Sequence, residues 1–404
     1  MQELGLIFRA LLRNKVGALL ISLQIALTLT IMVNAIFMMQ ERSAQMQRSS
    51  GLDEANLFNL NNTIFAQEYN QLVNLEEDLA LLRQTDGVVD AIQINAIPIS
   101  GGGWSMGLKT EPGDDTSSTV GAVYMVDDHA INTLGLELIA GENFSPTDIE
   151  WRPSGKNSWP AKTIISQAMA QALFPDDWQS AIGKTAYINN NEPMQITGII
   201  KSLQAPWNGW DGVERSMLVP YKMESSGGRF MIRTESGRRD ELMPIIEKAL
   251  SESNKGRIIR RVTTMDETRE RSYRGHNAVN KILSSVIIVL TLITGFGIVG
   301  LAMFSINRRT KQIGTRRALG ATQWQIMSYF MIENLMISSF GVILGVAGAI
   351  GLNVWLVSTF SLSPINMNLI LFGVVALYIV GQIAVLYPAR KAAMISPATA
   401  TRTA

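Results

Sequence analysis

Five cations and no acid lie in the stretch from Asn307 to Gln325, between two long apolar runs. The cations are Arg308, Arg309, Lys311, Arg316 and Arg317. A short loop with this much positive charge between two membrane spans is expected on the cytoplasmic side of the membrane. Two functions fit these residue types. Either the loop fixes the membrane topology and binds lipid headgroups, or a cytoplasmic partner binds the loop and displaces it.

The spacing within this stretch predicts a short helix, a turn and the start of a second helix. Thr310 to Leu319 forms the short helix, and Gly320 supplies the left-handed residue that ends it. Thr322 and Gln325 have the spacing of a capping box, so the next helix begins there.

The rest of the chain offers no credible reaction centre. The Gly-Lys-Thr at 183–185 looks like the end of a phosphate-binding loop, but Trp178 stands where that motif requires glycine. His129 and His276 have no metal-ligand spacing, and the chain has no cysteine. We therefore expect no ATPase motif and no catalytic, cofactor-binding or metal-binding residue in this chain.

Four charge-free apolar runs are long enough to cross a bilayer at about 1.5 Å per residue. They cover residues 16–40, 282–306, 334–357 and 366–387. The mean hydropathy of +0.14 is high for a chain with 17% charged residues. The first run is too long for the apolar core of a signal peptide. The sequence therefore predicts an α-helical integral membrane protein with four transmembrane helices.

Charge is distributed unevenly along the chain. The segments 1–15, 307–325 and 388–404 hold eleven Lys and Arg and one acid, whereas residues 41–281 hold 24 Lys and Arg against 32 Asp and Glu. The positive-inside rule then places both termini and the basic loop in the cytoplasm and the 41–281 region outside. Residues 1–15 are predicted to form an amphipathic lead-in along the inner membrane surface.

Glu333 is the only acid in the long apolar part of the chain after residue 281. An ionised residue at membrane depth is costly unless it is paired. We expect Glu333, at the inner end of the third span, to pair with an arginine of the basic loop.

Small residues recur on the predicted spans, and in the first span they fall on every fourth residue. The set is Ala18, Ser22, Ala26 and Thr30 in the first span, Gly295 and Gly297 in the second, and Gly341 and Gly345 in the third. Small side chains let helices pack closely within lipid. The stripes therefore either pack the spans of one chain together or contact a second copy.

Residues 41–281 have the composition of a large polar α/β domain. A strand–helix–strand pattern occurs at 56–65, 67–83 and 88–97, and again at 229–234, 239–253 and 257–263. Two such units side by side form a small α/β sandwich. The residues between them, 98–228, are predicted to form an inserted subdomain with short strands near 120–126, 161–166, 194–200 and 216–220. Residues 264–306 are predicted to form one long helix.

The basic loop resembles the characteristic loop of the MacB/FtsX-like ABC permease family, also called type VII or mechanotransmission transporters. The matching residues are Arg309, Thr310, Ile313, Gly314, Arg316, Arg317, Ala318, Gly320 and Ala321. Gln312 stands where the family usually has Glu, which makes this loop more basic. The resemblance implies that the loop docks on an ATPase. The implied coupling residues are Arg308, Arg309, Lys311, Ile313, Gly314, Arg316, Arg317, Leu319 and Gly320.

The polar domain resembles the MacB-like periplasmic domain through short segments that occur in the same order. They include Gly141-Glu142-Asn143-Phe144, Ala181-Ile182-Gly183-Lys184 and Val219-Pro220-Tyr221. The resemblance implies a Porter-like subdomain at 51–97 and 229–265, a Sabre-like insertion at 98–228 and a helical stalk at 266–281.

The resemblance as a whole implies the permease subunit of an ABC transporter in the bacterial inner membrane. Separate ATPase subunits would bind ATP and Mg²⁺, so no cofactor is expected in this chain. Further implied partners are a second permease, identical or related, a periplasmic adaptor and an outer-membrane channel. The implied activity is export of an antibiotic, a peptide or a similar substrate. Lipoprotein release, control of a cell-wall hydrolase, and a membrane-anchored sensor without an ATPase remain alternatives.

Overall fold

The computed structural model describes residues 15–65, 70–153, 155, 158–189, 191–224, 227–360 and 363–396. The chain divides into two compact units. The helical unit comprises the described parts of residues 1–46 and 276–404, and the β-rich unit those of residues 47–275. Most of the predicted amphipathic lead-in, residues 1–14, lies outside the described residues.

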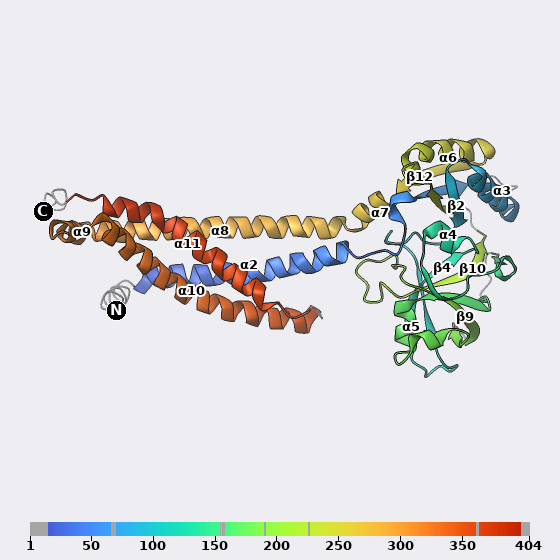
Figure 1. Cartoon of the computed structure of the whole chain (residues 1–404), viewed down its shortest axis with the longest axis horizontal. Helices are drawn as coiled ribbons and strands as arrows, with labels where there is room; N and C mark the ends of the chain where they lie inside the picture. Colours follow the sequence, from blue (N-terminus) through green and yellow to red (C-terminus); the bar gives the residue numbers. More distant parts are fainter. Residues whose placement is uncertain are drawn as a thin grey trace. The chain divides into compact units, whose positions relative to one another are not determined.

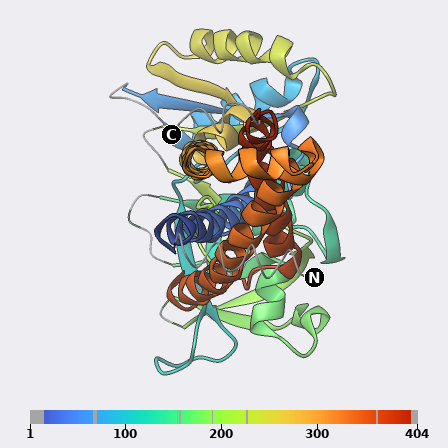
Figure 2. The ribbon, with the colours of Figure 1, turned by 90° about the vertical axis from the view of Figure 1, so that its left-hand side faces the viewer.

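The described residues of the helical unit form five helices. They are α2 (Lys15–Met46), α8 (Arg274–Arg308), α9 (Thr310–Ala318), α10 (Gln323–Phe360) and α11 (Met367–Ala393). All except α9 are long and apolar enough to cross a membrane. Figure 1 shows these four helices side by side, and Figure 2 shows α9 lying across one end of the group. The predicted fold class, with four spans and a large α/β domain after the first, is confirmed.

The small residues of α2 face α10 within the chain. The side chains of Ser22, Thr30 and Asn34 donate hydrogen bonds of 3.1–3.2 Å to backbone carbonyls of α10. A Cβ added at Gly341 would lie 2.7 Å from the carbonyl oxygen of Ser22, and one at Gly345 would lie 2.8 Å from an α2 side chain. Close approach of the two backbones therefore requires glycine on α10 and small polar residues on α2.

The glycines of α8 differ from one another. A Cβ at Gly297 would lie 2.5 Å from the Gln24 amide oxygen of α2, whereas one at Gly295 would meet no atom of the described chain within 4 Å. The hydroxyls of Thr28 and Thr294 lie 2.8 Å apart between the same two helices. Gly297 thus serves packing inside the chain, and no such contact explains Gly295.

The first sheet of the β-rich unit has four antiparallel strands in the order β12-β1-β11-β2. They are β1 (Leu57–Ile64), β2 (Val88–Gln93), β11 (Arg229–Thr234) and β12 (Arg257–Thr264). Helices α3 (Gln71–Gln84) and α6 (Arg239–Ser253) share one apolar core with this sheet, in which Leu79, Phe230 and Ile246 are buried. Both helices therefore cover the same face, and the two strand–helix–strand units form a two-layer α/β sandwich.

The second sheet is built by the inserted residues. Its strands are β3 (Trp104–Lys109), β4 (Thr119–Val126), β5 (Leu138–Gly141), β6 (Glu150–Arg152), β7 (Lys162–Ser166), β8 (Thr185–Ile188), β9 (Glu192–Ile200) and β10 (Ser216–Met223). The order β4-β3-β8-β9-β7-β10 closes on itself because β10 also pairs with β4. The closed ring surrounds a core in which Met194, Ile196 and Met217 are fully buried.

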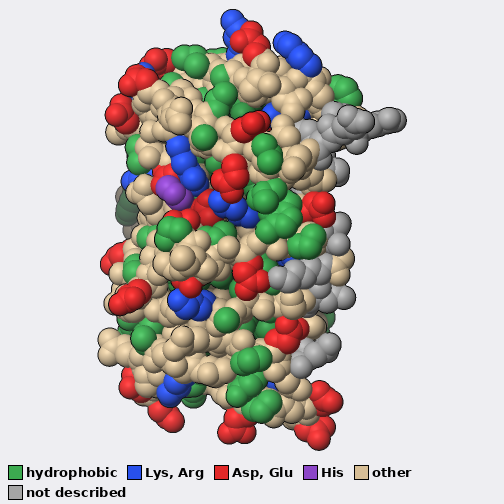
Figure 3. All heavy atoms as spheres, turned by 90° about the vertical axis from the view of Figure 1, so that its right-hand side faces the viewer, with side chains coloured by type: hydrophobic (Ala, Val, Ile, Leu, Met, Phe, Trp, Pro, Cys, Tyr) green, Lys and Arg blue, Asp and Glu red, His purple; other side chains and the backbone are tan. Residues whose placement is uncertain are grey.

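Short helices connect these strands. They are η1 (Glu54–Asn56), α4 (Ala130–Leu134), η2 (Pro146–Asp148), α5 (Gln167–Leu173), η3 (Trp178–Ala181) and α7 (Met265–Ser272). Figure 3 shows one face of the β-rich unit, on which acidic and basic side chains are interspersed. Among the described residues, no group of three or more His, Cys, Asp or Glu side chains is placed to hold a metal ion.

The prediction of one helix from 264 to 306 is wrong, because the chain breaks at Tyr273 between α7 and α8. Tyr273 is 2% exposed, and its hydroxyl accepts a hydrogen bond from the Gln204 amide at 3.0 Å. Burial of this ring in the β-rich unit ends α7, and a capping box between Thr264 and Glu267 fixes where α7 begins.

An ion pair ties α7 to the segment that follows α2. Arg269 Nε donates to Glu54 at 2.9 Å, and Arg269 Nη1 donates to the carbonyl of Arg48 at 3.2 Å. Burial of Glu54 favours a higher pKa, but the hydrogen bonds from Arg269 and Ser50 outweigh it and hold the pKa below its ordinary value of 4.5. The two chain segments that enter and leave the β-rich unit are thereby joined.

We predict that Gly345→Ala lowers the thermal midpoint of the detergent-purified chain. The added methyl overpacks the contact with α2, which typically costs about 1–3 kcal/mol. Gly351→Ala is the matched control on the same helix, because a Cβ there meets no described atom within 4 Å. The control should be neutral or stabilising by up to about 1 kcal/mol, since alanine favours helix. Equal midpoints for the two variants would contradict the α2–α10 contact.

We predict that Glu54→Gln makes thermal stability less dependent on acid pH. The folded-state pKa of Glu54 lies below its unfolded value, so the pair stabilises the fold above about pH 4.5 and this contribution is lost as the pH falls. Thermal midpoints measured from neutral pH downwards should therefore fall more steeply for the wild type than for Glu54→Gln. Parallel curves would show that the pair contributes nothing.

Candidate functional site

Helix α9 and the two turns that flank it form a corner at one end of the helical unit, here called the α9 corner (residues 306–333). Gly320, at φ +95°, ends the turn after α9, as predicted. The predicted capping box is also present, because the Thr322 amide donates to Gln325 Oε1 at 2.8 Å and the Gln325 amide donates to Thr322 Oγ1 at 3.2 Å. Local sequence thus determines where α9 ends and α10 begins.

An apolar cluster seats α9 against the other helices. Ile313 of α9 is 4% exposed and packs with Ile306, Ile326, Phe330 and Ala389, which come from α8, α10 and α11. Gly314 is also buried in α9. A short helix with one buried apolar side and one charged side is thereby held in a fixed position by tertiary packing.

The predicted pair between Glu333 and a loop arginine is present. Arg309 Nη1 lies 3.0 and 3.1 Å from the two carboxylate oxygens of Glu333, and their side chains are 18% and 9% exposed. Arg309 is the residue before α9, whereas Glu333 lies in α10. The pair therefore locks the start of α9 to α10 in a largely buried setting.

The remaining cations of the corner differ in how firmly they are held. Arg317 Nη1 donates to the Ala321 carbonyl at 2.7 Å, and the Arg316 guanidinium lies 5.1 Å from the Tyr329 ring centroid. Arg308 lies over the ring of Phe304 at 4.4 Å. These contacts orient the guanidinium groups and leave Arg308 and Arg316 exposed on the surface.

The exposed surface of the corner combines positive charge with apolar side chains. Lys311 is exposed, and Leu319 and Trp324 are 83% and 68% exposed. Leu319 belongs to the predicted site, whereas Trp324 and the ring of Tyr329 are not predicted from the sequence. In the sequence, these two residues are marked only as aromatic residues close to a basic loop. Trp and Tyr in that setting are also common as anchors at the membrane–water interface. A basic surface with a protruding leucine suits docking against an acidic partner with an apolar recess.

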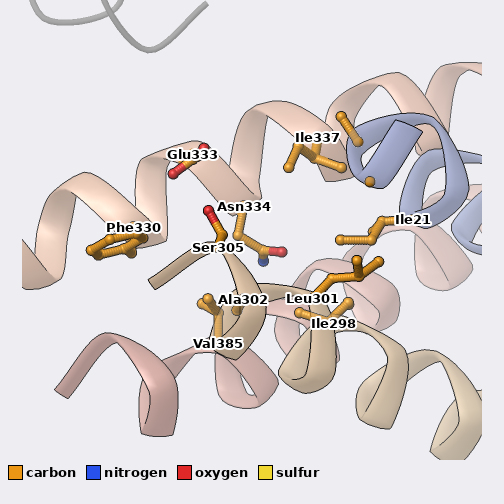
Figure 4. A pocket seen from close by; sticks show the side chains of 12 residues that line it. Ile21, Ile298, Leu301, Ala302, Ser305, Phe330, Glu333, Asn334, Ile337 and Val385 are labelled. Atoms are coloured by element: carbon orange, nitrogen blue, oxygen red, sulfur yellow. The ribbon is translucent and has the colours of Figure 1, made fainter. Parts of the chain in front are cut away.

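A pocket lies directly beside the ion pair. It has roughly 500 Å³ of space including its open mouth, and Ala18, Ile298, Phe330, Glu333 and Asn334 are among its lining residues. Figure 4 shows the Glu333 and Asn334 side chains on one helix above apolar side chains of the neighbouring helices. The Asn334 amide donates to the Gly381 carbonyl of α11 at 3.0 Å. The polar side chains of Glu333 and Asn334 thus connect α10 to Arg309 and to α11.

The other predicted residues lie away from the corner. Ser22, Ala26, Thr30, Gly341 and Gly345 lie in the α2–α10 contact described above. The lysine of the Gly-Lys-Thr stretch lies over the ring of Phe174 at 4.4 Å and donates to Ser180 Oγ at 2.9 Å. His129 lies 3.0 Å from the Asp90 carboxylate.

Two family models match this chain. Residues 18–248 match the MacB-like periplasmic core domain, and residues 284–397 match the FtsX-like permease C-terminal domain. The chain belongs to the MacB/FtsX-like family of ABC transporter permeases. It is therefore a membrane protein whose β-rich unit is a MacB-like extracellular domain. The FtsX-like match includes the whole α9 corner.

Curated relatives are similar over much of the chain. YknZ of Bacillus subtilis (strain 168), named an uncharacterized ABC transporter permease, is 28% identical over 300 residues, covering 72% of this chain and 71% of the relative. MacB of Marinobacter nauticus, named a macrolide export ATP-binding/permease protein, is 28% identical over 254 residues, which cover 59% of this chain and 38% of the relative. PvdT of Pseudomonas entomophila, named a pyoverdine export ATP-binding/permease protein, is 25% identical over 271 residues, which cover 65% of this chain and 40% of the relative. The chain thus spans less than half the length of these two export proteins.

Among solved structures, the extracellular domain of YknZ is covered completely and aligns with 50% of this chain, at 18% identity and a TM-score of 0.32. The periplasmic region of MacB from Actinobacillus actinomycetemcomitans aligns with 56% of this chain, at 12% identity and a TM-score of 0.36.

We predict that Arg309→Ala destabilises the chain far more than Arg316→Ala. Loss of Arg309 leaves a buried carboxylate unpaired, which typically costs about 3–5 kcal/mol, whereas an exposed cation–π contact contributes about 0.5–1 kcal/mol. Thermal midpoints in detergent measure the difference. The exchanged pair Arg309→Glu/Glu333→Arg should recover part of the loss. Equal midpoints for the two single variants would contradict a structural role for the ion pair.

Proposed function

We propose that this permease couples ATP binding and hydrolysis by separate ATPase subunits to movement of its extracellular domain, which drives export. The observation that carries the proposal is the α9 corner. It presents an exposed basic and apolar surface, yet a buried ion pair and an apolar cluster fix it to three long helices. A surface built in this way can receive a displacement and pass it on without being deformed.

The path of the displacement follows from chain connectivity. Helix α8 ends beside α9 and has 35 residues, which at about 1.5 Å each gives a rod of roughly 50 Å. That length exceeds the bilayer's hydrocarbon core of about 30 Å. At its other end α8 follows α7, which the Glu54–Arg269 pair joins to the segment after α2. We propose that α8 and α2 carry the motion together into the extracellular domain.

The spans themselves do not suit passage of a polar substrate. Within the described parts of the four long apolar helices, Glu333 is the one acid in their apolar stretches, and Arg309 neutralises it. Polar conduits through membranes use ionisable residues that face the path. This supports mechanical transmission, with the substrate moved on the extracellular side.

The proposed setting is the bacterial inner membrane, with both termini in the cytoplasm and the ATP and Mg²⁺ held by the ATPase subunits. A second permease copy or a related permease is the proposed partner within the membrane. Helix α8 supports this, because it is the least buried of the four spans and its Gly295 has no packing contact in the described chain. The names of MacB and PvdT favour an export substrate, with a periplasmic adaptor and an outer-membrane channel as further proposed partners.

We predict that Lys311→Glu/Leu319→Ser abolishes co-purification of an ABC ATPase with the affinity-tagged chain. Both side chains are exposed in the α9 corner, so the double change removes docking chemistry and leaves the corner's internal contacts intact. The control is Lys391→Glu/Met394→Ser, which changes one exposed cation and one exposed apolar residue at the end of α11. Mass spectrometry of the detergent-solubilised complex should show at least a tenfold loss in the first variant alone.

Equal loss in both variants would indicate a general charge effect, and no ATPase with the wild type would overturn the coupling proposal. In the second case the sensor without an ATPase would become the better explanation.

A further inference from the structure

The second face of the four-stranded sheet carries a row of polar residues in register. Asn61 of β1 pairs with Arg229 of β11 on one side and with Arg261 of β12 on the other. The neighbouring row contains Asn59 paired with Thr263. Paired residues in adjacent strands project to the same face, so both arginines lie on the side of the sheet away from α3 and α6.

These residues line a cleft together with Arg271 of α7. We call it the arginine cleft and define it by Asn59, Asn61, Arg229, Arg261, Thr263 and Arg271. It has roughly 650 Å³ of space including its open mouth. That is large enough for a charged group attached to a larger molecule.

The arginine cleft has positive charge without a counterion. No acid is among its described lining residues, and none of its three arginines forms an ion pair with another described residue. Other arginines of the same unit are paired, for example Arg257 with Asp78 at 2.6 Å and Arg269 with Glu54. Arg229 donates to the backbone carbonyl of Asn95, which carries no formal charge. The three guanidinium groups of this concave site therefore remain without a counterion among the described residues and attract an anion.

An adjoining pocket shares Asn61 and Arg229 and contains one carboxylate, that of Glu224. The preference for an anion is therefore strongest on the side of Arg261 and Arg271.

Two buried polar atoms of the cleft lack a partner. Thr263 is 2% exposed, and its hydroxyl makes no hydrogen bond in the described chain. The amide oxygen of Asn61 is also buried without a partner. Buried polar atoms in proteins are normally hydrogen-bonded, so these two atoms have unused hydrogen-bonding capacity beside the cleft. Of the two atoms, the Thr263 hydroxyl is the one that can donate a hydrogen bond to an oxyanion.

We propose that the arginine cleft binds a phosphate group, either of a free small molecule or of a lipid headgroup. Three guanidinium groups that arrive from β11, β12 and α7 fit a tetrahedral group with several acceptor oxygens better than a planar carboxylate. The Thr263 hydroxyl donates to one phosphate oxygen. This site does not depend on the proposed coupling function, because it rests only on residues of the β-rich unit.

The test titrates the full chain, in an uncharged detergent, with inorganic phosphate and separately with dihexanoyl phosphatidic acid. Dihexanoyl phosphatidylcholine serves as the lipid control. The variant Arg229→Gln/Arg261→Gln should weaken binding at least tenfold by calorimetry. The matched control Lys248→Gln/Lys255→Gln removes the same charge from exposed positions in α6 and the loop after it, and should change affinity less than twofold.

A second variant covers the case in which the double arginine variant fails to fold. Thr263→Val keeps the shape of the side chain and removes the orphan hydroxyl, so the ligand-free thermal midpoint should stay equal or rise. Its affinity for phosphate should nevertheless fall several-fold.

Each outcome of the titration decides the matter. Binding of phosphatidic acid alone identifies a lipid headgroup site, and binding of inorganic phosphate supports a free ligand. The proposal is overturned if neither ligand binds the wild type, or if the arginine and threonine variants bind as the wild type does.

Discussion

The ion pair between Arg309 and Glu333 is the interaction on which the rest of the proposed machinery depends. Taking two charges out of water is expensive, and their attraction offsets this only with good geometry and further contacts. Here both carboxylate oxygens lie within 3.1 Å of one guanidinium nitrogen. An apolar cluster that includes Ile313 and Phe330 surrounds the same corner. The cost of separating these charges keeps α9 and α10 in one arrangement, and the proposed transmission through α9 requires this.

Two further contacts hold other parts of the chain in a fixed arrangement, one in the helical unit and one in the β-rich unit. Within the span region, α2 and α10 approach closely through Gly341, Gly345 and small polar residues, and three side-chain hydrogen bonds to backbone carbonyls hold their register. Such bonds contribute about 0.6 kcal/mol each in membranes, so the geometry matters more than the energy of any one bond. In the β-rich unit, the Glu54–Arg269 pair joins the chain segments that lead from α2 and to α8. Each unit thus has a close contact of its own that the proposed transmission would use.

Features that depend on residues close together in the sequence could be predicted, and features that depend on distant residues could not. The end of α9 at Gly320 and the capping box at Thr322 depend on neighbouring residues, and both are present. The partner of Glu333 could be predicted because only arginines of the adjacent loop lie within reach of a buried acid. The break at Tyr273 could not, since it depends on Gln204, which is distant in sequence. Strands β3, β5, β6 and β8 were missed because they have only three to six residues. Their pairing also depends on distant strands, since β3 and β8 lie within the closed ring and β5 and β6 pair outside it with β9 and β10. The arginine cleft could not be predicted from the sequence either. Arg229 and Arg261 are brought to the same face of the sheet only because β1 pairs with β11 on one side and with β12 on the other.

The measurement that tests the central claim most directly is amide hydrogen exchange in residues 264–276, where the β-rich unit leads into α8. The permease would be reconstituted with its ATPase and compared with and without ATP, as wild type and as Arg309→Ala. The account predicts that ATP changes exchange in this segment of the wild type. It also predicts that, below the thermal midpoint of Arg309→Ala, the change is lost in this variant although the variant is folded and still binds the ATPase. An ATP-dependent change that persists unaltered in Arg309→Ala, or one that is absent from the wild type, would contradict transmission through the α9 corner.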